Sequence, residues 1–388
     1  MGFAKRQLEE AMEWHASLLD KVVCTSCLYD GFLKRWAARS KEKGECSYCG
    51  KQRRVRDMDA LLDLVREGIG LEWTDAVNEL PWDGEEGAYF GENHNSYELV
   101  SQCIDTISEY EEIIGDIALA LPDKVWCPVD PFRLSTRERL IYGWQSFQEH
   151  VTHKQRFFFH GAALSPDDEE GMSVNEWMSA LADAVRRCAL VVTLPAGTLV
   201  HRARESESGE AFSTAGQLGT CPAAKAVKTH RMSPPGIPLF YGSFEKATAI
   251  AEARQSPSLP VYVGTFRLRR NFRVLDLCRI PSVPSLYDRR NRAKRPFLAF
   301  LREFAENVGR PIARDDRVHL DYIPTQVVSE FFRCRFKERD GTRLDGILYP
   351  SAAASGGRNA ALFVASEACV DATSADGLLI LDSSGIAP

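Results

Sequence analysis

The chain has 388 residues, of which 44% are hydrophobic, and a formal net charge of −6 at pH 7. This length suits two domains, and the apolar fraction is enough to build a buried core in each. The net negative charge argues against a general polyanion-binding protein, so nucleic acid is not the expected partner. No run of 18 apolar residues is present and the N-terminus lacks an apolar signal-peptide core, so we expect a cytoplasmic protein without a membrane span.

Two closely spaced cysteine pairs stand near the N-terminus. Cys24 and Cys27 form the first pair, and Cys46 and Cys49 form the second after eighteen intervening residues. Four thiolates at this spacing suit zinc, which prefers soft ligands in tetrahedral coordination. Because sulfur would fill all four positions, we predict a structural zinc site and not a catalytic one. The alternative is a set of ordinary reduced thiols, which is what we expect of the seven scattered cysteines.

The N-terminal half has helical patterns throughout. Apolar residues three or four positions apart indicate helices at about 4–22, 57–69, 96–121 and 135–154. The sequence Ser-Pro-Asp-Asp-Glu-Glu-Gly at 165–171 is typical of a linker. We therefore expect a helical N-terminal regulatory domain at 1–165, with a zinc knuckle at 24–49, and a second domain at 166–388.

Charge is distributed unevenly along the chain. From Glu67 to Asp123 there are fifteen carboxylates and no lysine or arginine. From Arg267 to Arg317 there are fourteen basic residues against six acidic ones. Because the two segments have opposite signs, our first hypothesis is that they dock on each other within the chain. The alternative is an acidic surface that mimics a substrate or recruits a partner.

From Leu190 onward, short β-rich runs alternate with turns. We expect strands at 198–203, 239–243, 261–268, 273–277, 346–349, 360–365 and 378–381, and helices around 245–254 and 325–336. This separation of strands from helices predicts an α+β fold, with a mixed α/β second domain after the mostly helical first one. Neither GxGxxG after a strand nor GxxxxGK[ST] is present, which excludes the two common phosphate-loop designs.

The second half contains side chains that suit a phosphorylated sugar carrying an aromatic base. Arginine forks match pyrophosphate oxygens, a tyrosine offers a flat ring, and short polar groups beside glycines let a ligand approach the backbone. These candidates are Arg202, Arg204, Arg231, Tyr241, Glu252, Ser351 and Asn359. Each has an ordinary alternative, because Glu252 on a helix is usually a solvated surface residue and Tyr241 in a strand is usually a core ring. Their joint appearance in order is what favours a site.

The local sequences around these residues resemble the RES domain family over roughly Pro195 to Ser366. The matching motifs are Val200-His-Arg202-Ala-Arg204, Arg231-Met-Ser-Pro-Pro-Gly236 through Tyr241, Ala249-Ile-Ala-Glu252, and Asp345-Gly-Ile-Leu-Tyr-Pro-Ser351 with Asn359. One departure is the tract from Thr229 to Ser233, which lacks the aromatic residue and the asparagine typical of the family. The substrate pocket is therefore expected to differ there.

The N-terminal half resembles the helical, cysteine-containing HEPN/RES N-terminal type of domain that precedes some RES domains. HEPN ribonucleases use an arginine and a histidine close together in sequence. The nearest match, Arg156 and His160, has a shorter and apolar spacing. We therefore interpret this half as regulatory and not as a ribonuclease.

The resemblance implies an ADP-ribosyltransferase-like domain that binds NAD as its substrate and breaks the bond between nicotinamide and ribose. The expected protein is an NAD glycohydrolase or NAD phosphorylase that depletes cellular NAD as a toxin or antiphage effector, with an antitoxin or activator protein, or a second copy of itself, as partner. By the same resemblance, catalysis falls to Arg202, Arg231, Tyr241, Glu252 and Ser351. NAD binding falls to Arg202, Arg204, Arg231, Tyr241, Ser351 and Asn359.

Two alternatives remain open from the sequence. The same residues would serve an ADP-ribosyltransferase that modifies a protein or a metabolite. A protein of another class, a zinc-containing nucleic-acid or partner-binding module with an inactive RES domain, would have the same motifs without NAD cleavage.

Overall fold

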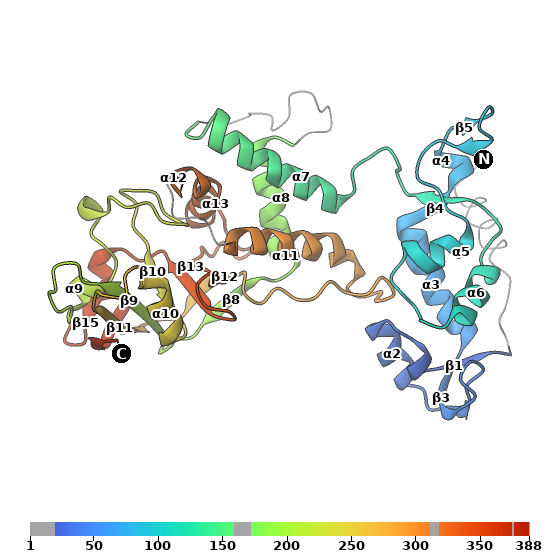
Figure 1. Ribbon diagram of the computed structural model, residues 1–388, viewed down its shortest axis with the longest axis horizontal. Helices are drawn as coiled ribbons and strands as arrows, with labels where there is room; N and C mark the ends of the chain where they lie inside the picture. Colours follow the sequence, from blue (N-terminus) through green and yellow to red (C-terminus); the bar gives the residue numbers. More distant parts are fainter. Residues whose placement is uncertain (1–19, 159–171, 311–317, 375, 388) are drawn as a thin grey trace. The chain divides into compact units, whose positions relative to one another are not determined.

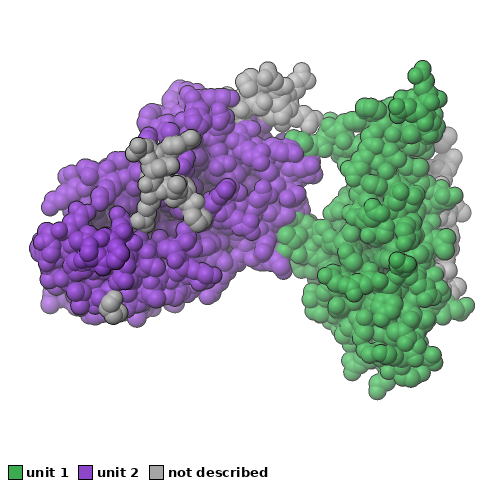
Figure 2. All heavy atoms as spheres, viewed as in Figure 1, with its two compact units in different colours: residues 1–134, 283–295 green, residues 135–282, 296–388 purple. Residues whose placement is uncertain are grey.

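The computed structural model describes residues 20–158, 172–310, 318–374 and 376–387. It contains two compact units, which Figure 2 colours separately. The N-terminal unit comprises residues 1–134 together with 283–295, and the C-terminal unit comprises 135–282 and 296–388. Residues 283–295, which we call the insert, therefore fold with the N-terminal unit although the C-terminal unit lies on both sides of them in sequence.

This division differs from the boundary expected near residue 165. Helix α7 (Thr136–Glu149) belongs to the C-terminal unit, because its aromatic residues pack on α8 (Val174–Arg187). Trp144 and Phe147 of α7 stack on Trp177 of α8, with ring centroids 5.3 Å and 4.8 Å away. The expected linker at 165–171 lies outside the described residues, as do most of the helix expected at 4–22 and His160 of the HEPN comparison.

The N-terminal unit consists of short elements around one apolar core. In chain order these are β1 (Val22–Cys24), η1 (Thr25–Cys27), α2 (Gly31–Ala38), β2 (Lys43–Glu45), β3 (Gln52–Asp57), α3 (Met58–Glu72), β4 (Trp73–Asp75), α4 (Ala76–Glu79), β5 (Trp82–Asp83), β6 (Ala88–Tyr89), α5 (Ser96–Glu98), η2 (Leu99–Cys103), α6 (Glu111–Ala120) and β7 (Trp126–Pro128). Strands β1, β3 and β2 form an antiparallel sheet beside the cysteine pairs. Helix α3 supplies much of the core, since six of its apolar side chains are buried.

The single helix expected at 96–121 is wrong. The chain is helical through α5 and η2, leaves the helix at Ile104, and becomes helical again only at α6. The segment between them makes long-range contacts that a continuous helix would prevent. Ile107 O accepts a hydrogen bond from Tyr29 N at 2.7 Å, and Ser108 Oγ donates to Cys27 O at 2.6 Å. Tertiary pairing therefore overrides an apolar periodicity that is present in the sequence.

The C-terminal unit is built on a nine-stranded sheet in the order β15-β16-β11-β9-β10-β14-β13-β12-β8. Its strands are β8 (Val191–Leu194), β9 (Leu199–Glu205), β10 (Phe240–Ser243), β11 (Val261–Leu268), β12 (Phe272–Asp276), β13 (Gly346–Pro350), β14 (Arg358–Leu362), β15 (Cys369–Asp371) and β16 (Leu379–Ile386). Neighbouring strands are antiparallel except for the pairs β12–β13 and β15–β16. The seven strands expected from the sequence are all present, and the α+β fold class is confirmed.

Helices cover this sheet at two places (Figure 1). Helix α10 (Lys246–Ala253) packs beside β9, β10 and β11. A larger group shares one apolar core with β12 and β13, and it consists of α7, α8, α11 (Arg295–Gly309) and α13 (Ile323–Cys334). The short elements α9 (Ala215–Leu218), α12 (Val318–Asp321), η3 (His150–Lys154), η4 (Ala223–Lys225), η5 (Arg292–Lys294) and η6 (Ser366–Ala368) complete the described helices.

Candidate active site

The side chain of Glu252 lies at the centre of the predicted site. It projects from the last turn of α10, and one of its oxygens, Oε1, accepts two hydrogen bonds. Ser351 Oγ donates at 2.6 Å and Asn359 Nδ2 donates at 2.7 Å. Asn359 is buried, and its own Oδ1 accepts a 2.7 Å hydrogen bond from Ser243 Oγ. Residues of α10, β10, β14 and the loop after β13 therefore fix the orientation of the Glu252 carboxylate.

The sheet register explains why these residues meet. Ser243 of β10 is paired with Asn359 of β14, so both side chains point to the same face as the neighbouring helix α10. The loop between β13 and β14 can lie against that helix only because Gly357 has no side chain, since a Cβ there would be 2.6 Å from Thr248 Oγ1. Ser351 begins this loop, where its Oγ also accepts from the backbone N–H groups of Ala353 and Ala354.

Two tyrosines extend this face of the sheet. Tyr241 stands two residues before Ser243 on β10, and its hydroxyl shares a 2.9 Å hydrogen bond with Ser233 Oγ. Burial raises the pKa of Tyr241 to about 12. Tyr349 on β13 is buried, and its pKa lies well above the usual range because of burial, followed by the nearby Tyr241 and the carboxylate of Glu252. The positive charge of Arg231 acts on the pKa of Tyr349 in the opposite direction.

Arg231 is held by the end of helix α11. Its guanidinium donates to Val308 O at 2.6 Å and to Arg310 O at 2.9 Å, and it lies 5.5 Å from the ring centroid of Tyr322. Its own backbone carbonyl accepts a hydrogen bond from Thr325 Oγ1 at the start of α13. Gln326 holds the preceding residues of the same loop, donating to His230 O at 2.8 Å. The tract that departs from the RES motif is therefore fixed by α13.

Arg202 and Arg204 point to the face of β9 opposite α10, because the adjacent His201 pairs with Ser243 on the α10 side. The two arginines contact different neighbours. Arg202 donates from Nη1 to Tyr241 O at 2.9 Å, and its Nε is buried without a partner among the described residues. Burial, followed by the charge of Arg204, lowers the pKa of Arg202 to about 10. Arg204 instead donates to Gln217 O and lies over the ring of Phe212. No described contact joins Arg204 to Glu252, so the structure does not bring it to the carboxylate.

His230 directly precedes Arg231 in the chain, and the centroid of its ring lies 5.3 Å from that of Tyr241. Part of the residue is exposed, but desolvation of the imidazole, followed by the positive charges of Arg202 and Lys228, lowers its pKa to about 4. The imidazole is therefore neutral at physiological pH.

A pocket of about 600 Å³ opens next to this cluster, at the carboxyl ends of the parallel strands β12 and β13. Its volume is typical of small-molecule sites, and that edge of a parallel pair is a usual place for them. The lining residues come from the loop after β12, from α11 and from the end of β13: Leu277, Cys278, Ile280, Arg302, Ala305, Glu306, Asn307, Gly309, Arg310 and Pro350. None is a predicted site residue, although Pro350 precedes Ser351 and Arg310 O binds Arg231.

Comparison with known protein families identifies the family of the domain that carries this site. The sequence matches the RES domain over residues 181–382, which is 202 of the 388 residues. The chain belongs to the RES domain family. RES domains are associated with NAD-using, toxin-like enzymes. A second match, to HEPN/RES N-terminal domain 1, covers residues 39–164. Searches of curated proteins and of solved structures found no match.

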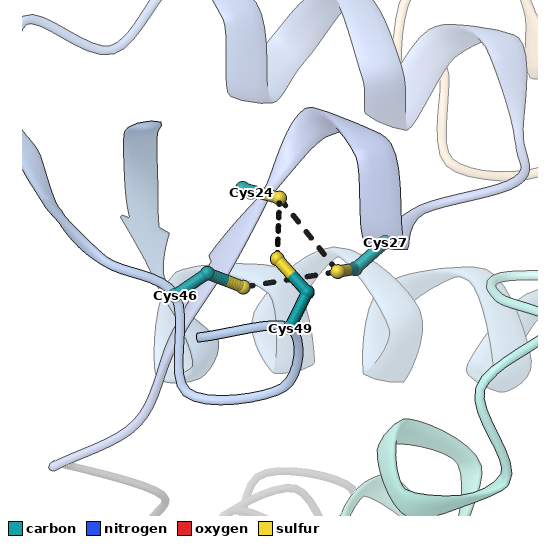
Figure 3. Close-up of side chains that lie close together, drawn as sticks. All are labelled: Cys24, Cys27, Cys46 and Cys49. Carbon is teal, nitrogen blue, oxygen red and sulfur yellow. Dashed lines mark hydrogen bonds between the residues drawn. The ribbon is translucent and has the colours of Figure 1, made fainter. Parts of the chain in front are cut away.

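The four cysteines of the N-terminal unit converge as predicted (Figure 3). Their sulfur atoms all lie within 4.8 Å of one another. Three of these pairs are Cys24–Cys27 at 3.6 Å, Cys24–Cys49 at 3.7 Å and Cys27–Cys46 at 3.8 Å. Gly50, at φ 65°, completes the turn that carries the second pair, since its N–H bonds to Cys46 O. The HEPN/RES match begins between the two pairs, so it includes only the second.

Three residues of the RES site were absent from the sequence-based prediction: Ser243, Tyr349 and Gln326. Ser243 could have been found from strand alternation, because it is two residues from Tyr241 and must share its face. Tyr349 stands inside the RES motif from Asp345 to Ser351, but its burial near Glu252 depends on the register of β13 with β14. Gln326 binds a loop 96 residues earlier in the chain, for which the sequence holds no local signal.

None of the helices in the described part of the chain is both long and apolar enough to cross a membrane.

Proposed function

We propose that this RES protein cleaves the bond between nicotinamide and ribose in NAD, as a glycohydrolase or phosphorylase, and depletes cellular NAD as a toxin or defence effector. The observation that carries the proposal is the Glu252 carboxylate, oriented by Ser351 and Asn359 on a shared oxygen. Its second oxygen, Oε2, accepts no hydrogen bond from the described residues, so it is available to a ribose hydroxyl.

The charge of Glu252 suits this reaction. When nicotinamide leaves as a neutral molecule, positive charge develops on the ribose ring, and a fixed carboxylate beside it stabilises that charge. Water adding to the ribose carbon would give ADP-ribose and a proton, and phosphate adding there would give ADP-ribose phosphate. Among the described residues, no lysine, arginine or histidine forms an ion pair with Glu252, so its charge is not neutralised in the free protein.

Arg202 and Arg231 support binding of the pyrophosphate. Arg231 uses two of its N–H donors on backbone carbonyls, which fixes the orientation of its guanidinium and leaves other donors for a ligand. Arg202 has a buried Nε with no acceptor in the described part of the chain. A buried donor without a partner is costly, and a phosphate oxygen would satisfy it. Arg204 fits a supporting position better than a direct ligand contact.

We propose further that Cys24, Cys27, Cys46 and Cys49 hold a structural zinc. With Zn–S bonds of about 2.3 Å, a tetrahedral site places sulfur atoms about 3.8 Å apart. Three of the sulfur pairs are separated by 3.6 to 3.8 Å, which fits this geometry. The metal would bind the first strand and the β2–β3 hairpin of the N-terminal unit together, and no catalytic step passes through it.

The decisive experiment measures free nicotinamide and remaining NAD with the purified full-length chain, with and without phosphate. A fragment beginning at residue 166 is unsuitable, because it would lack α7 and separate the insert from its own unit. We expect nicotinamide release by the wild type, with a loss on the order of a hundredfold for Glu252→Gln. Glu149→Gln, at an exposed position of α7, is the matched control. Equal rates for wild type and Glu252→Gln would overturn the assignment.

Labelled NAD identifies the acceptor in the same assay. If the ADP-ribose label stays free, the acceptor is water or phosphate. Label retained on a protein or metabolite would support the transferase alternative. Intact NAD together with salt-dependent binding to nucleic acid would instead favour a binding protein.

A further inference from the structure

The insert is seated in the core of the N-terminal unit. Leu286 and Tyr287 are almost completely buried there, in the same apolar core as α3 and α6. Helix α3 makes room for them at Gly68, where an added Cβ would be 3.0 Å from Leu286 Cγ and 3.4 Å from Tyr287 Cδ1. Gly68, inside α3, therefore forms the floor of a slot for the insert.

Polar contacts fix the insert in that slot. The carboxylate of Asp105 accepts from both Nη atoms of Arg295, at 2.7 and 2.9 Å, and from the backbone N–H of Leu286 at 2.8 Å. Glu72 lies 3.5 Å from Arg295 Nε. A bidentate, partly buried arginine–carboxylate pair of this kind is both strong and specific in geometry. It uses a carboxylate of the acidic segment and an arginine of the basic segment, as the docking hypothesis required.

Helix α11 connects this anchor to the RES site. The helix begins at Arg295 and ends at Gly309, a length of about 22 Å for its 15 residues. Val308 O in its last turn and Arg310 O just beyond its end are the acceptors that hold the guanidinium of Arg231. The second half of the same helix contributes five residues to the lining of the 600 Å³ pocket: Arg302, Ala305, Glu306, Asn307 and Gly309. Leu277, Cys278 and Ile280, in the segment that leads into the insert from the other side, line it as well.

We propose that the seated insert is a control arm through which the N-terminal unit sets the affinity of the RES site for NAD. While Arg295 and Tyr287 are seated, α11 is fixed at its first turn and presents two carbonyls that preorganise Arg231. When the insert leaves the slot, Arg231 loses its fixed orientation and NAD binds more weakly, because ordering the arginine then costs part of the binding free energy. The proposal rests on the proposed function for its ligand.

Two glycines of α3 provide a matched test. Gly68→Leu places a side chain in the slot of the insert, whereas Gly70→Leu, two residues later, adds the same side chain where nothing lies within 4 Å. We expect Gly68→Leu to raise the KM for NAD roughly tenfold with kcat almost unchanged, as for loss of uniform binding, and Gly70→Leu to leave both unchanged. Asp105→Asn, which removes the charge without removing bulk, should act in the same direction as Gly68→Leu.

Hydrogen–deuterium exchange supplies a readout that needs no catalysis. In Gly68→Leu, exchange should rise in residues 283–295 and also in residues 229–241, which carry Arg231. Coupling is reciprocal, so NAD bound to Glu252→Gln should protect residues 283–295. Unchanged zinc content and an unchanged melting transition of the C-terminal unit would show that Gly68→Leu has folded.

The outcomes separate this proposal from the proposed function. If the wild type releases nicotinamide but KM stays constant and exchange changes only within the N-terminal unit, the control arm is refuted and the activity stands. If the wild type releases no nicotinamide but exchange in residues 229–241 still responds to Gly68→Leu, the coupling stands and the assigned substrate falls.

Discussion

Glu252 and Ser351 are 99 positions apart in the chain, yet Ser351 Oγ donates a 2.6 Å hydrogen bond to Glu252 Oε1. The same serine oxygen accepts hydrogen bonds from two backbone N–H groups of its own loop, which leaves its hydroxyl proton directed towards Glu252. This arrangement converts a helix glutamate into a carboxylate of fixed orientation. Two roles for Ser351 can be distinguished experimentally, one acting through Glu252 and one on the ribose itself.

A double-mutant cycle separates these two roles of Ser351. We expect Ser351→Ala to lower kcat for NAD cleavage about tenfold, because Glu252 then loses one of its two orienting donors. In a Glu252→Gln background the same substitution should cost less than about threefold, since residues that act as a unit are not additive. Ser355→Ala, at an exposed position of the same loop, is the control. Full additivity of the two substitutions would instead place Ser351 on the substrate.

Ser243 should be important for stability as well as for the site. Ser243→Ala would leave the buried Oδ1 of Asn359 without its donor, which costs about 1–3 kcal/mol of unfolding free energy. Activity should also fall, because the amide of Asn359 would no longer be held towards Glu252. Denaturant unfolding and nicotinamide release measure the two effects. If neither stability nor activity changes, the hydrogen-bond relay from Ser243 to Glu252 does not exist in solution.

The strands and the central site residues could be predicted because they depend on local patterns. Alternation of apolar and polar residues located β9 to β14, and the RES motifs indicated Glu252 and Ser351. The partnership of Ser243 with Asn359 could not be predicted, because it depends on the pairing of β10 with β14 across more than a hundred residues. A one-residue change of register would have turned both side chains to the opposite face.

The basic segment shows a different limit. Its arginines suggested docking onto the acidic segment, and Arg289 and Arg295 do bind Glu67 and Asp105. Because the prediction for this segment considered only charge, it missed helix α11, whose apolar residues such as Leu301 and Phe304 are buried in the core of the C-terminal unit. It also missed Tyr287, a fully buried side chain among arginines. The unit in which a residue is buried depends on tertiary packing, which cannot be predicted from the number of charged residues in a segment.

Loss of the predicted zinc should unfold the N-terminal unit selectively. Cys46→Ser removes one of four sulfur ligands, and structural zinc contributes on the order of 10 kcal/mol of apparent binding free energy to small domains. We expect loss of stoichiometric zinc and loss of the corresponding melting transition. The C-terminal unit has its own core, so its transition should remain. Cys334→Ser, at an exposed position, is the control, and a Cys46→Ser protein that retains both zinc and the transition would contradict the site.

Gly143 tests the assignment of α7 to the C-terminal unit. A Cβ at this position would lie 2.4 Å from Trp177 Cδ1, so Gly143→Ala must displace the stacked aromatic cluster. Overpacking of this kind typically costs about 1–3 kcal/mol. The C-terminal transition should therefore melt earlier in calorimetry, while the N-terminal one is unchanged. Gly115→Ala on α6, where nothing lies within 4 Å, should leave the C-terminal transition where it is. A shift of the N-terminal transition by Gly143→Ala would place α7 in the other unit.

His150 should make the C-terminal unit sensitive to acid. Its ring is buried, Nε2 has no partner among the described residues, and burial, followed by the charge of Lys154, lowers its pKa. Because the unfolded chain has a histidine pKa of about 6.5, the unfolded state binds a proton more readily than the folded state. The stabilising contribution of the neutral ring is therefore complete above a pH of about 6.5 and is lost as the pH falls towards the folded-state pKa.

Melting temperatures measured at about pH 7.5 and about pH 5.5, on either side of the histidine reference value, check this expectation. Acidification should lower the melting temperature of the C-terminal unit less in His150→Gln than in the wild type, because the substitution removes the group that titrates. His319→Gln, at an exposed position of α12, should respond to acid as the wild type does. If His150→Gln and the wild type lose the same stability on acidification, the buried ring is not the group responsible, and another of the histidines or carboxylates must account for the acid sensitivity.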